Sequence, residues 1–267
     1  MKVFNIGKHI IWSILGTLVI LFPKSAAYAQ FDARLYTRLV EETSRLELLD
    51  DHLLTLTAFR TLMPFDEQAK YAVARRIGDF QNGLENILRG LPRDPQAEKL
   101  YLTVEEDWNF YQAYLQKEPL TTEDWHRLDQ IRRKLAADLT KFSEYLSIYT
   151  IPNERLHEQA ELLHALNSEI SEAFLSAVLK KKFRRLPVSA GNPVKLLEKA
   201  DRNVVASEKS FPDGRANTEV KKLRTAVRTF YRGMKNHYDP VILFDSYLQA
   251  SDRILRLHDE AFTQAMP

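Results

Sequence analysis

The sequence contains no cysteine among its 267 residues and only 8 glycines. The absence of cysteine excludes disulfide bridges, thiolate metal sites and haem attachment through cysteine, so the fold must be held together by packing. No segment alternates between apolar and polar residues with a period of two, so the sequence predicts no β-strand. The 11 prolines are spaced singly or in short groups between long segments, as breaks between helices would be.

Motifs that place catalytic groups are also missing. There is no G-x-S-x-G, no phosphate-binding loop, no G-x-G-x-x-G and no paired carboxylate motif in a recognisable context. We therefore expect a protein that is not an enzyme and that holds no cofactor. The formal net charge is +2 at pH 7, which argues against a dedicated nucleic-acid binder, so no nucleic-acid partner is expected.

The N-terminal residues 1–29 have the organisation of a secretory signal peptide. A start with two lysines is followed by an apolar run over residues 10–22 and by an A-x-A motif that ends at Ala29. We expect cleavage between Ala29 and Gln30 and a mature protein that is periplasmic or secreted. The apolar run is shorter than the roughly 20 residues that a membrane-spanning helix needs, but an uncleaved membrane anchor remains an alternative.

Apolar residues recur at steps of three and four through almost the whole mature chain. The first mature segment shows the pattern in six leucines: Leu35, Leu39, Leu46, Leu49, Leu53 and Leu56. Such steps over three or more turns predict amphipathic helices, and the breaks divide them into about eight. Short connections make neighbouring helices antiparallel. The predicted fold is therefore all-α without a sheet, with tandem antiparallel four-helix bundles over residues 30–151 and 152–267.

Polar residues after the breaks indicate where helices begin. Pro64-Phe65-Asp66 separates the first two predicted helices, and Asp66 is a plausible N-cap for the second.

An internal duplication would explain two similar halves. The pairs Phe110-Tyr111 and Phe230-Tyr231 lie 120 residues apart, each on the predicted third helix of its half. The same spacing relates leucines of the next predicted helices, Leu128 and Leu135 to Leu248 and Leu255. A duplication is one interpretation; chance matches between amphipathic helices are the other.

Aromatic residues provide the first candidates for ligand binding. Trp108, Tyr111, Phe230 and Tyr231 lie on predicted helices, and aromatic side chains often line a pocket between helices. Trp108 and Tyr111 also fall on an apolar stripe, so packing in the core is the alternative role.

Histidines and a carboxylate provide a candidate metal site. His157, Glu161 and His164 share one helix face, and imidazole and carboxylate groups can bind zinc or copper. The alternative is a solvated polar stripe beside the core. Because no H-E-x-x-H motif and no second ligand cluster accompanies them, we expect no bound metal.

Charge is distributed unequally between the halves. Residues 30–151 contain 16 Lys and Arg against 21 Asp and Glu, whereas residues 152–267 contain 19 against 15. Basic side chains of the second half form a run and a helix face: Lys180, Lys181, Lys182, Arg184, Arg185, Lys221, Arg224, Arg228, Arg232 and Lys235. This face would suit an anionic protein, the acidic half of a second copy in a homodimer, or an anionic membrane surface. A solvated helix face is the alternative.

Residues 80–115 resemble a known family. Phe80, Leu84, Ile87 and Gly90 close one predicted helix, and after a loop the next helix carries Val104, Trp108 and Tyr111. This stretch is similar to the PilJ-type sensor domain at the N-terminus of type IV pili methyl-accepting chemotaxis transducers. The resemblance implies a periplasmic helical sensor domain, which in that family also occurs in tandem behind an export signal.

The similar nitrate sensors carry anion-binding arginines on their first helix. Here the matching segment LTLTAFRTLM, residues 54–63, has only Arg60 in a comparable place. The resemblance therefore implies sensing without implying that the ligand is an anion.

These observations favour an exported binding or interaction module of the sensor-domain type, with a small molecule as one class of partner. The alternative is a structural or chaperone-like protein that self-associates through its long amphipathic helices.

Overall fold

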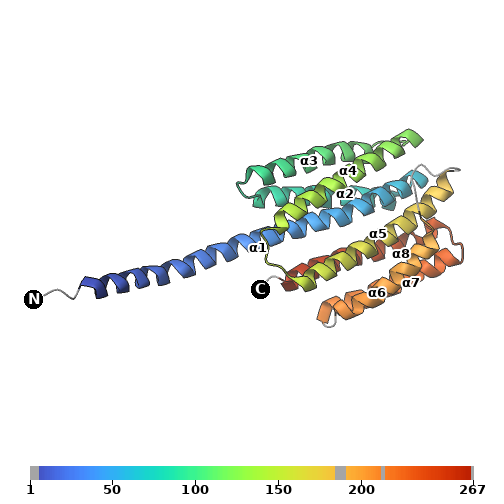
Figure 1. The fold of residues 1–267 in the computed structure, drawn as a ribbon. Helices are drawn as coiled ribbons and strands as arrows, with labels where there is room; N and C mark the ends of the chain where they lie inside the picture. Colours follow the sequence, from blue (N-terminus) through green and yellow to red (C-terminus); the bar gives the residue numbers. More distant parts are fainter. Residues whose placement is uncertain (1–5, 184–190, 212–213, 266–267) are drawn as a thin grey trace, which may run out of the picture.

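The computed structural model describes the backbone of residues 6–183, 191–211 and 214–265, and the side chains of these segments from Ala33 to Gln264. The described residues form eight α-helices and no strand, which confirms the all-α prediction (Figure 1). The helices are α1 (Ile6–Leu62), α2 (Glu67–Gly90), α3 (Pro95–Leu115), α4 (Thr122–Ser147), α5 (Glu154–Lys182), α6 (Pro193–Ser210), α7 (Gly214–Lys235) and α8 (Pro240–Ala265).

Polar side chains fix where the helices begin. The Asp66 carboxylate accepts a hydrogen bond from the backbone N–H of Ala69 at 3.0 Å, which confirms it as the N-cap of α2. At the start of α4, Thr121 and Asp124 form a capping box, each side chain accepting from the other residue's backbone N–H. These caps satisfy N–H groups that have no partner within a helix, so the breaks seen in the sequence become sharp turns.

The helices pack in two sets of four. In the first set α2 and α4 pack on α1, and α3 packs on α4; in the second set α6 and α8 pack on α5, and α7 packs on α6 and α8. The sets meet where α1 packs on α5 (Figure 1). We call this contact, with the helices that flank it, the seam. The predicted bundle arrangement is confirmed.

The buried positions of the two sets correspond along the chain. In the first two helices of each set Leu46 corresponds to Leu166 and Leu84 to Val204, and all four side chains are buried. In the last two helices the spacing is one residue shorter, because three residues join α6 to α7 where four join α2 to α3. Similar burial throughout is what an internal duplication predicts.

The Phe-Tyr pairs themselves are not equivalent, which corrects the match made from the sequence. Phe110 is 56% exposed while Phe230 is fully buried. With the shorter spacing the buried Tyr111 corresponds to the buried Phe230, and Trp108 corresponds to Val227. At a spacing of 120 residues the residue types match, but the matched residues lie on different faces of their helices.

The core is continuous through both sets. Trp108 stacks on Phe80 with ring centroids 3.9 Å apart inside the first set. Across the seam, Phe59 of α1 stacks on Phe244 of α8 at 3.8 Å. Aromatic side chains bury a large apolar area, so these contacts stabilise the seam as well as the bundles.

Within the part of the chain that the structure describes, no helix has an apolar stretch long enough to cross a bilayer. The predicted signal peptide lies outside the residues whose side chains are described, so cleavage after Ala29 stays a prediction.

Candidate functional site

Helix α1 buries polar side chains because it lies between four other helices. It packs on α2, α4, α5 and α8, so no face of its middle turns reaches water freely. Asp50 is 2% exposed and His52 is fully buried, between Leu49 and Leu53 of the core stripe. A buried polar group is costly unless it has partners, so these side chains require partners from the neighbouring helices.

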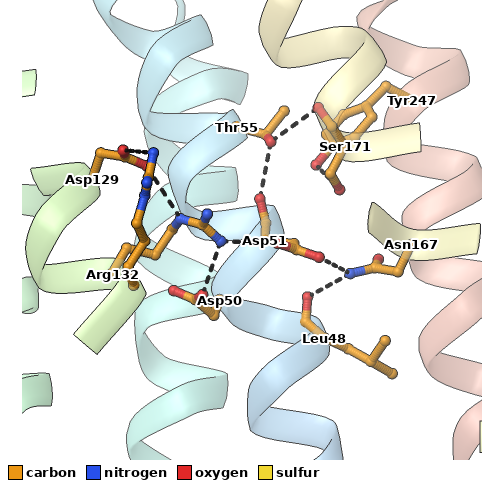
Figure 2. A network of polar contacts seen from close by, with 10 residues as sticks. Leu48, Asp50, Asp51, Thr55, Asp129, Arg132, Asn167, Ser171 and Tyr247 are labelled. Carbon is orange, nitrogen blue, oxygen red and sulfur yellow. Dashed lines mark hydrogen bonds and ion pairs between the residues drawn. The ribbon is translucent and has the colours of Figure 1, made fainter. Parts of the chain in front are cut away.

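Arg132 of α4 supplies the main partner for the carboxylates (Figure 2). Its Nη1 lies 3.3 Å from Asp50 Oδ2 and 3.1 Å from Asp51 Oδ1. Its Nε lies 3.8 Å from Asp129, one turn earlier on α4. One guanidinium therefore faces three carboxylates. Burial raises the pKa of Asp50 to about 8, and the attraction of Arg132 only partly opposes this.

Helix α5 joins the same network from the other set. Asn167 Nδ2 donates to the carbonyl oxygen of Leu48 at 3.0 Å and to Asp51 Oδ2 at 3.2 Å (Figure 2). Ser171 Oγ lies 3.4 Å from the hydroxyl of Tyr247 on α8. The network thus links α1 and α4 of the first set to α5 and α8 of the second.

On one side of the seam the two sets are joined directly, and we call this the closed side. There α8 packs on α1, and Ser251 Oγ lies 3.0 Å from His52 Nδ1. Side chains of α8 also reach α2: Arg76 pairs with Asp252, and Gln68 Nε2 donates to Asp245 at 3.0 Å. These contacts fix α8 against the first set.

Ser44 connects two histidines within the seam. Its Oγ lies 2.8 Å from Nε2 of His164 and 3.0 Å from Nε2 of His258. The Ser44 hydroxyl can donate its one proton to only one of the two rings, so the other ring must donate its N–H to the hydroxyl oxygen. Two neutral imidazoles satisfy this arrangement, because each has one donor and one acceptor nitrogen. Burial lowers the pKa of both, that of His164 to about 4. Nδ1 of His258 is 3.6 Å from Asp259, too far for the hydrogen bond of a Ser-His-Asp relay.

On the other side α4 does not make a comparable contact with α5, and we call this the open side. A pocket of about 880 Å³ lies there over α1, which we call the seam pocket. Its apolar wall includes Val40, Leu156 and Phe262, and its polar wall includes Ser44, Glu47 and His164. A smaller polar cavity of about 240 Å³ lies further along the same helices, beside Asp51 and Arg132.

Glu47 is the carboxylate held deepest against the seam pocket. Its side chain is 22% exposed, accepts from Thr140 Oγ1 at 3.1 Å and lies 3.7 Å from His164 Nε2. Burial raises its pKa to about 7, and the carboxylates of Asp51 and Glu144 act in the same direction. The pocket therefore contains a group that changes charge near neutral pH.

The aromatic candidates lie mainly in the core and not in the seam pocket. Trp108, Tyr111 and Phe230 are buried, and Tyr231 packs against the core at its edge. None of these four lines the pockets described above. Tyr111 extends toward the network, where burial and the Asp50 carboxyl raise the pKa of its hydroxyl.

The histidine and carboxylate candidates divide between two roles. His157 and Glu161 are exposed at the rim of the seam pocket, with Nε2 and Oε1 3.2 Å apart, while His164 turns inward to Ser44. In the described part of the chain, no group of three or more His, Asp or Glu side chains is arranged to hold a metal ion.

The basic face is partly occupied by contacts within the second set. Arg224 Nη1 lies 2.7 Å from Glu208 and Arg228 Nε lies 3.0 Å from Asp201, both on α6, and Lys181 pairs with Asp239. The remaining described members are exposed: Lys180, Lys182, Lys221, Arg232 and Lys235. Arg184 and Arg185 lie outside the described residues. An anionic partner stays a prediction for the exposed members.

Arg60, the residue compared with anion-binding arginines, is engaged in the first set. Its Nη2 donates to the carbonyl oxygen of Leu115 at 2.6 Å, at the C-terminus of α3, and its Nε lies 3.0 Å from Glu118. A cation at a helix C-terminus stabilises the exposed carbonyl groups, which accounts for this arginine structurally.

Comparison with known proteins gives no match to a family model, a curated protein or a solved structure. The site therefore has to be interpreted from its own geometry. Sequence reasoning missed both the network and the seam pocket, although one signal was present. Leu46, Leu48, Leu49, Leu53 and Leu54 cover more than one face of α1, which indicates a helix buried on several sides.

Proposed function

We propose that this protein is an exported helical binding module of the sensor-domain type, which holds a small organic molecule in the seam pocket. The observation that carries the proposal is the pocket itself, about 880 Å³ between α1, α4 and α5. Ligand pockets in proteins commonly have volumes of about 300–1,000 Å³ and combine apolar walls with a few convergent polar groups. Ser44, Glu47 and His164 are such groups here.

The position of the pocket supports sensing because its walls come from both sets. Thr140 and Glu144 belong to α4 of the first set, while His157 and Ala160 belong to α5 of the second. A ligand between them would favour one separation of α4 from α5 over another. A ligand shifts a conformational equilibrium only if it binds one conformation more tightly than the other. A change in the separation of α4 and α5 would leave the contacts on the closed side in place.

The alternative, a structural or chaperone-like protein that self-associates, has less support. Most large exposed apolar side chains lie apart, such as Phe65 between α1 and α2, Phe110 on α3 and Ile242 on α8. The one short group among the described residues is Ile148, Tyr149 and Ile151, between α4 and α5. Apolar side chains scattered in this way are normal on a monomer.

A pocket-filling substitution tests the proposal. Ala160→Trp places an indole in the seam pocket, whereas Ala137→Trp adds the same group at an exposed position on α4 outside it. In a thermal-shift screen of small organic compounds, wild type and Ala137→Trp should share their stabilising compounds, and Ala160→Trp should lose them. A ligand concentration of about 100 Kd stabilises by about 2.7 kcal/mol. Compounds that stabilise Ala160→Trp as strongly as wild type would place the binding site elsewhere.

A further inference from the structure

The charged residues that line the seam pocket are of one sign. Four glutamates line it, Glu47, Glu144, Glu154 and Glu161, and among the residues that the structure describes no lysine or arginine does. The chain as a whole has 38 basic and 36 acidic side chains, so its composition does not explain why the charged residues of the pocket are all acidic.

Glu47, whose side chain is 22% exposed, differs in its partners from the acids that are buried in the described chain. Asp50 is paired with Arg132, Glu169 with Lys199 at 2.8 Å, and Glu219 with Arg253 at 2.6 Å. Within the described chain, the basic group nearest to Glu47 is the ring of His164, 3.7 Å away.

The groups around Glu47 leave its negative charge uncompensated. From α1 it faces Asp51, from α4 it faces Thr140 and Glu144, and from α5 it faces His164. Since burial lowers the pKa of His164 to about 4, that ring is neutral at pH 7 and supplies no positive charge. A partly buried carboxylate without a cation is unfavourable, and a bound cation would relieve the cost.

We propose that the ligand of the seam pocket is an organic cation, an amine or ammonium compound with an apolar body. This inference rests on the proposed function. The cationic group lies against the Glu47 carboxylate, because hydrogen bonds between charged groups are stronger than those between neutral groups. The apolar body packs on Val40, Leu156 and Phe262, which line the same pocket.

The proposal also sets the pH dependence of binding. A cation binds the ionised form of Glu47, whose pKa is about 7 in the free protein. Affinity should therefore rise by up to about tenfold per pH unit below pH 7 and level off above pH 8. His164 is already neutral close to pH 7, and a neutral ligand should show no such rise.

The experiment compares matched probes by isothermal titration calorimetry on the purified protein. The panel consists of aryl-alkyl ammonium compounds such as 4-phenylbutylammonium, each with its alcohol and its carboxylate isostere. We expect binders among the ammonium compounds, at least about tenfold tighter than either isostere at pH 8. Glu47→Gln should reduce this preference about tenfold, whereas Glu158→Gln, which removes a charge from an exposed position on α5 outside the pocket, should not.

Two results would overturn the inference. The first is that alcohols or carboxylates bind as tightly as ammonium compounds and are lost in Ala160→Trp; the seam pocket then binds ligands, the proposed function stands, and the cation preference is wrong. The second is that no ammonium compound in the panel binds up to about 1 mM, in which case the charge of the wall does not select a cation.

Discussion

At the scale of single residues, Asp50 in the seam makes the stability of the folded protein depend on pH. Its pKa is about 8 in the folded protein against an ordinary value of 3.8, with burial as the main cause. Between these two values the folded state binds a proton that the unfolded state has lost. The free energy of unfolding therefore falls as pH rises through this window. Glu41 and Glu47, with pKa values raised to about 7 by burial, act in the same direction.

Asp50→Asn removes this penalty and keeps the shape of the side chain. We expect the variant to be more stable than wild type by about 1–3 kcal/mol at pH 8, with a smaller difference at pH 5, because the proton uptake of Asp50 no longer opposes folding. Chemical denaturation at the two pH values measures it. Glu106→Gln, which removes a charge at an exposed position on α3, should change stability by less than about 0.5 kcal/mol. A destabilised Asp50→Asn at pH 8 would mean that the charged pair with Arg132 outweighs burial.

At the scale of elements, a glycine of α2 allows this helix to pack closely against α1. A Cβ on Gly83 would lie 2.7 Å from Cδ2 of Leu46, a fully buried side chain of α1. A Cβ on Gly78, five residues earlier in the same helix, would meet nothing within 4 Å. The two glycines have the same backbone cost in a helix and differ only in what they face.

Alanine at these two positions should act in opposite directions. Gly78→Ala should stabilise the protein by about 0.5–1 kcal/mol through helix propensity. Gly83→Ala should destabilise it by about 1–3 kcal/mol, because Leu46 must move in a filled core. Thermal and urea denaturation of the two variants provide the comparison. Equal stabilisation of both would show that a Cβ on Gly83 does not press against Leu46 and that α1 and α2 lie further apart.

The elements themselves could be predicted from the sequence, and the seam could not. The steps of three and four predict all eight helices, and the break at Pro64 predicts Asp66 as the N-cap of α2. Local spacing, however, carries no information on which helix packs against which. The leucines on several faces of α1 indicate that other elements cover it, but they do not identify the helices that bury Asp50 and His52. The equivalence of Phe110 and Phe230 was wrong for a related reason, since one residue fewer between α6 and α7 changes the register.

At the scale of the whole molecule, two similar sets of helices meet asymmetrically. On the closed side α8 is fixed to α1 and α2 by Ser251, Asp252 and Asp245. On the open side α4 and α5 leave the seam pocket between them. Departure from the symmetry of the two sets thus creates the seam pocket, and the residues that line it come from segments far apart in the chain.

The most direct measurement of the central claim is amide-resolved NMR of the purified protein during titration with a library of small organic fragments. We predict that fragments which bind will shift amide signals of residues 37–47, 140–147 and 154–164, the segments that line the seam pocket, and that Ala160→Trp will abolish these shifts. Fragments that bind while leaving all three segments unshifted, or a library in which no fragment shifts them, would contradict the account.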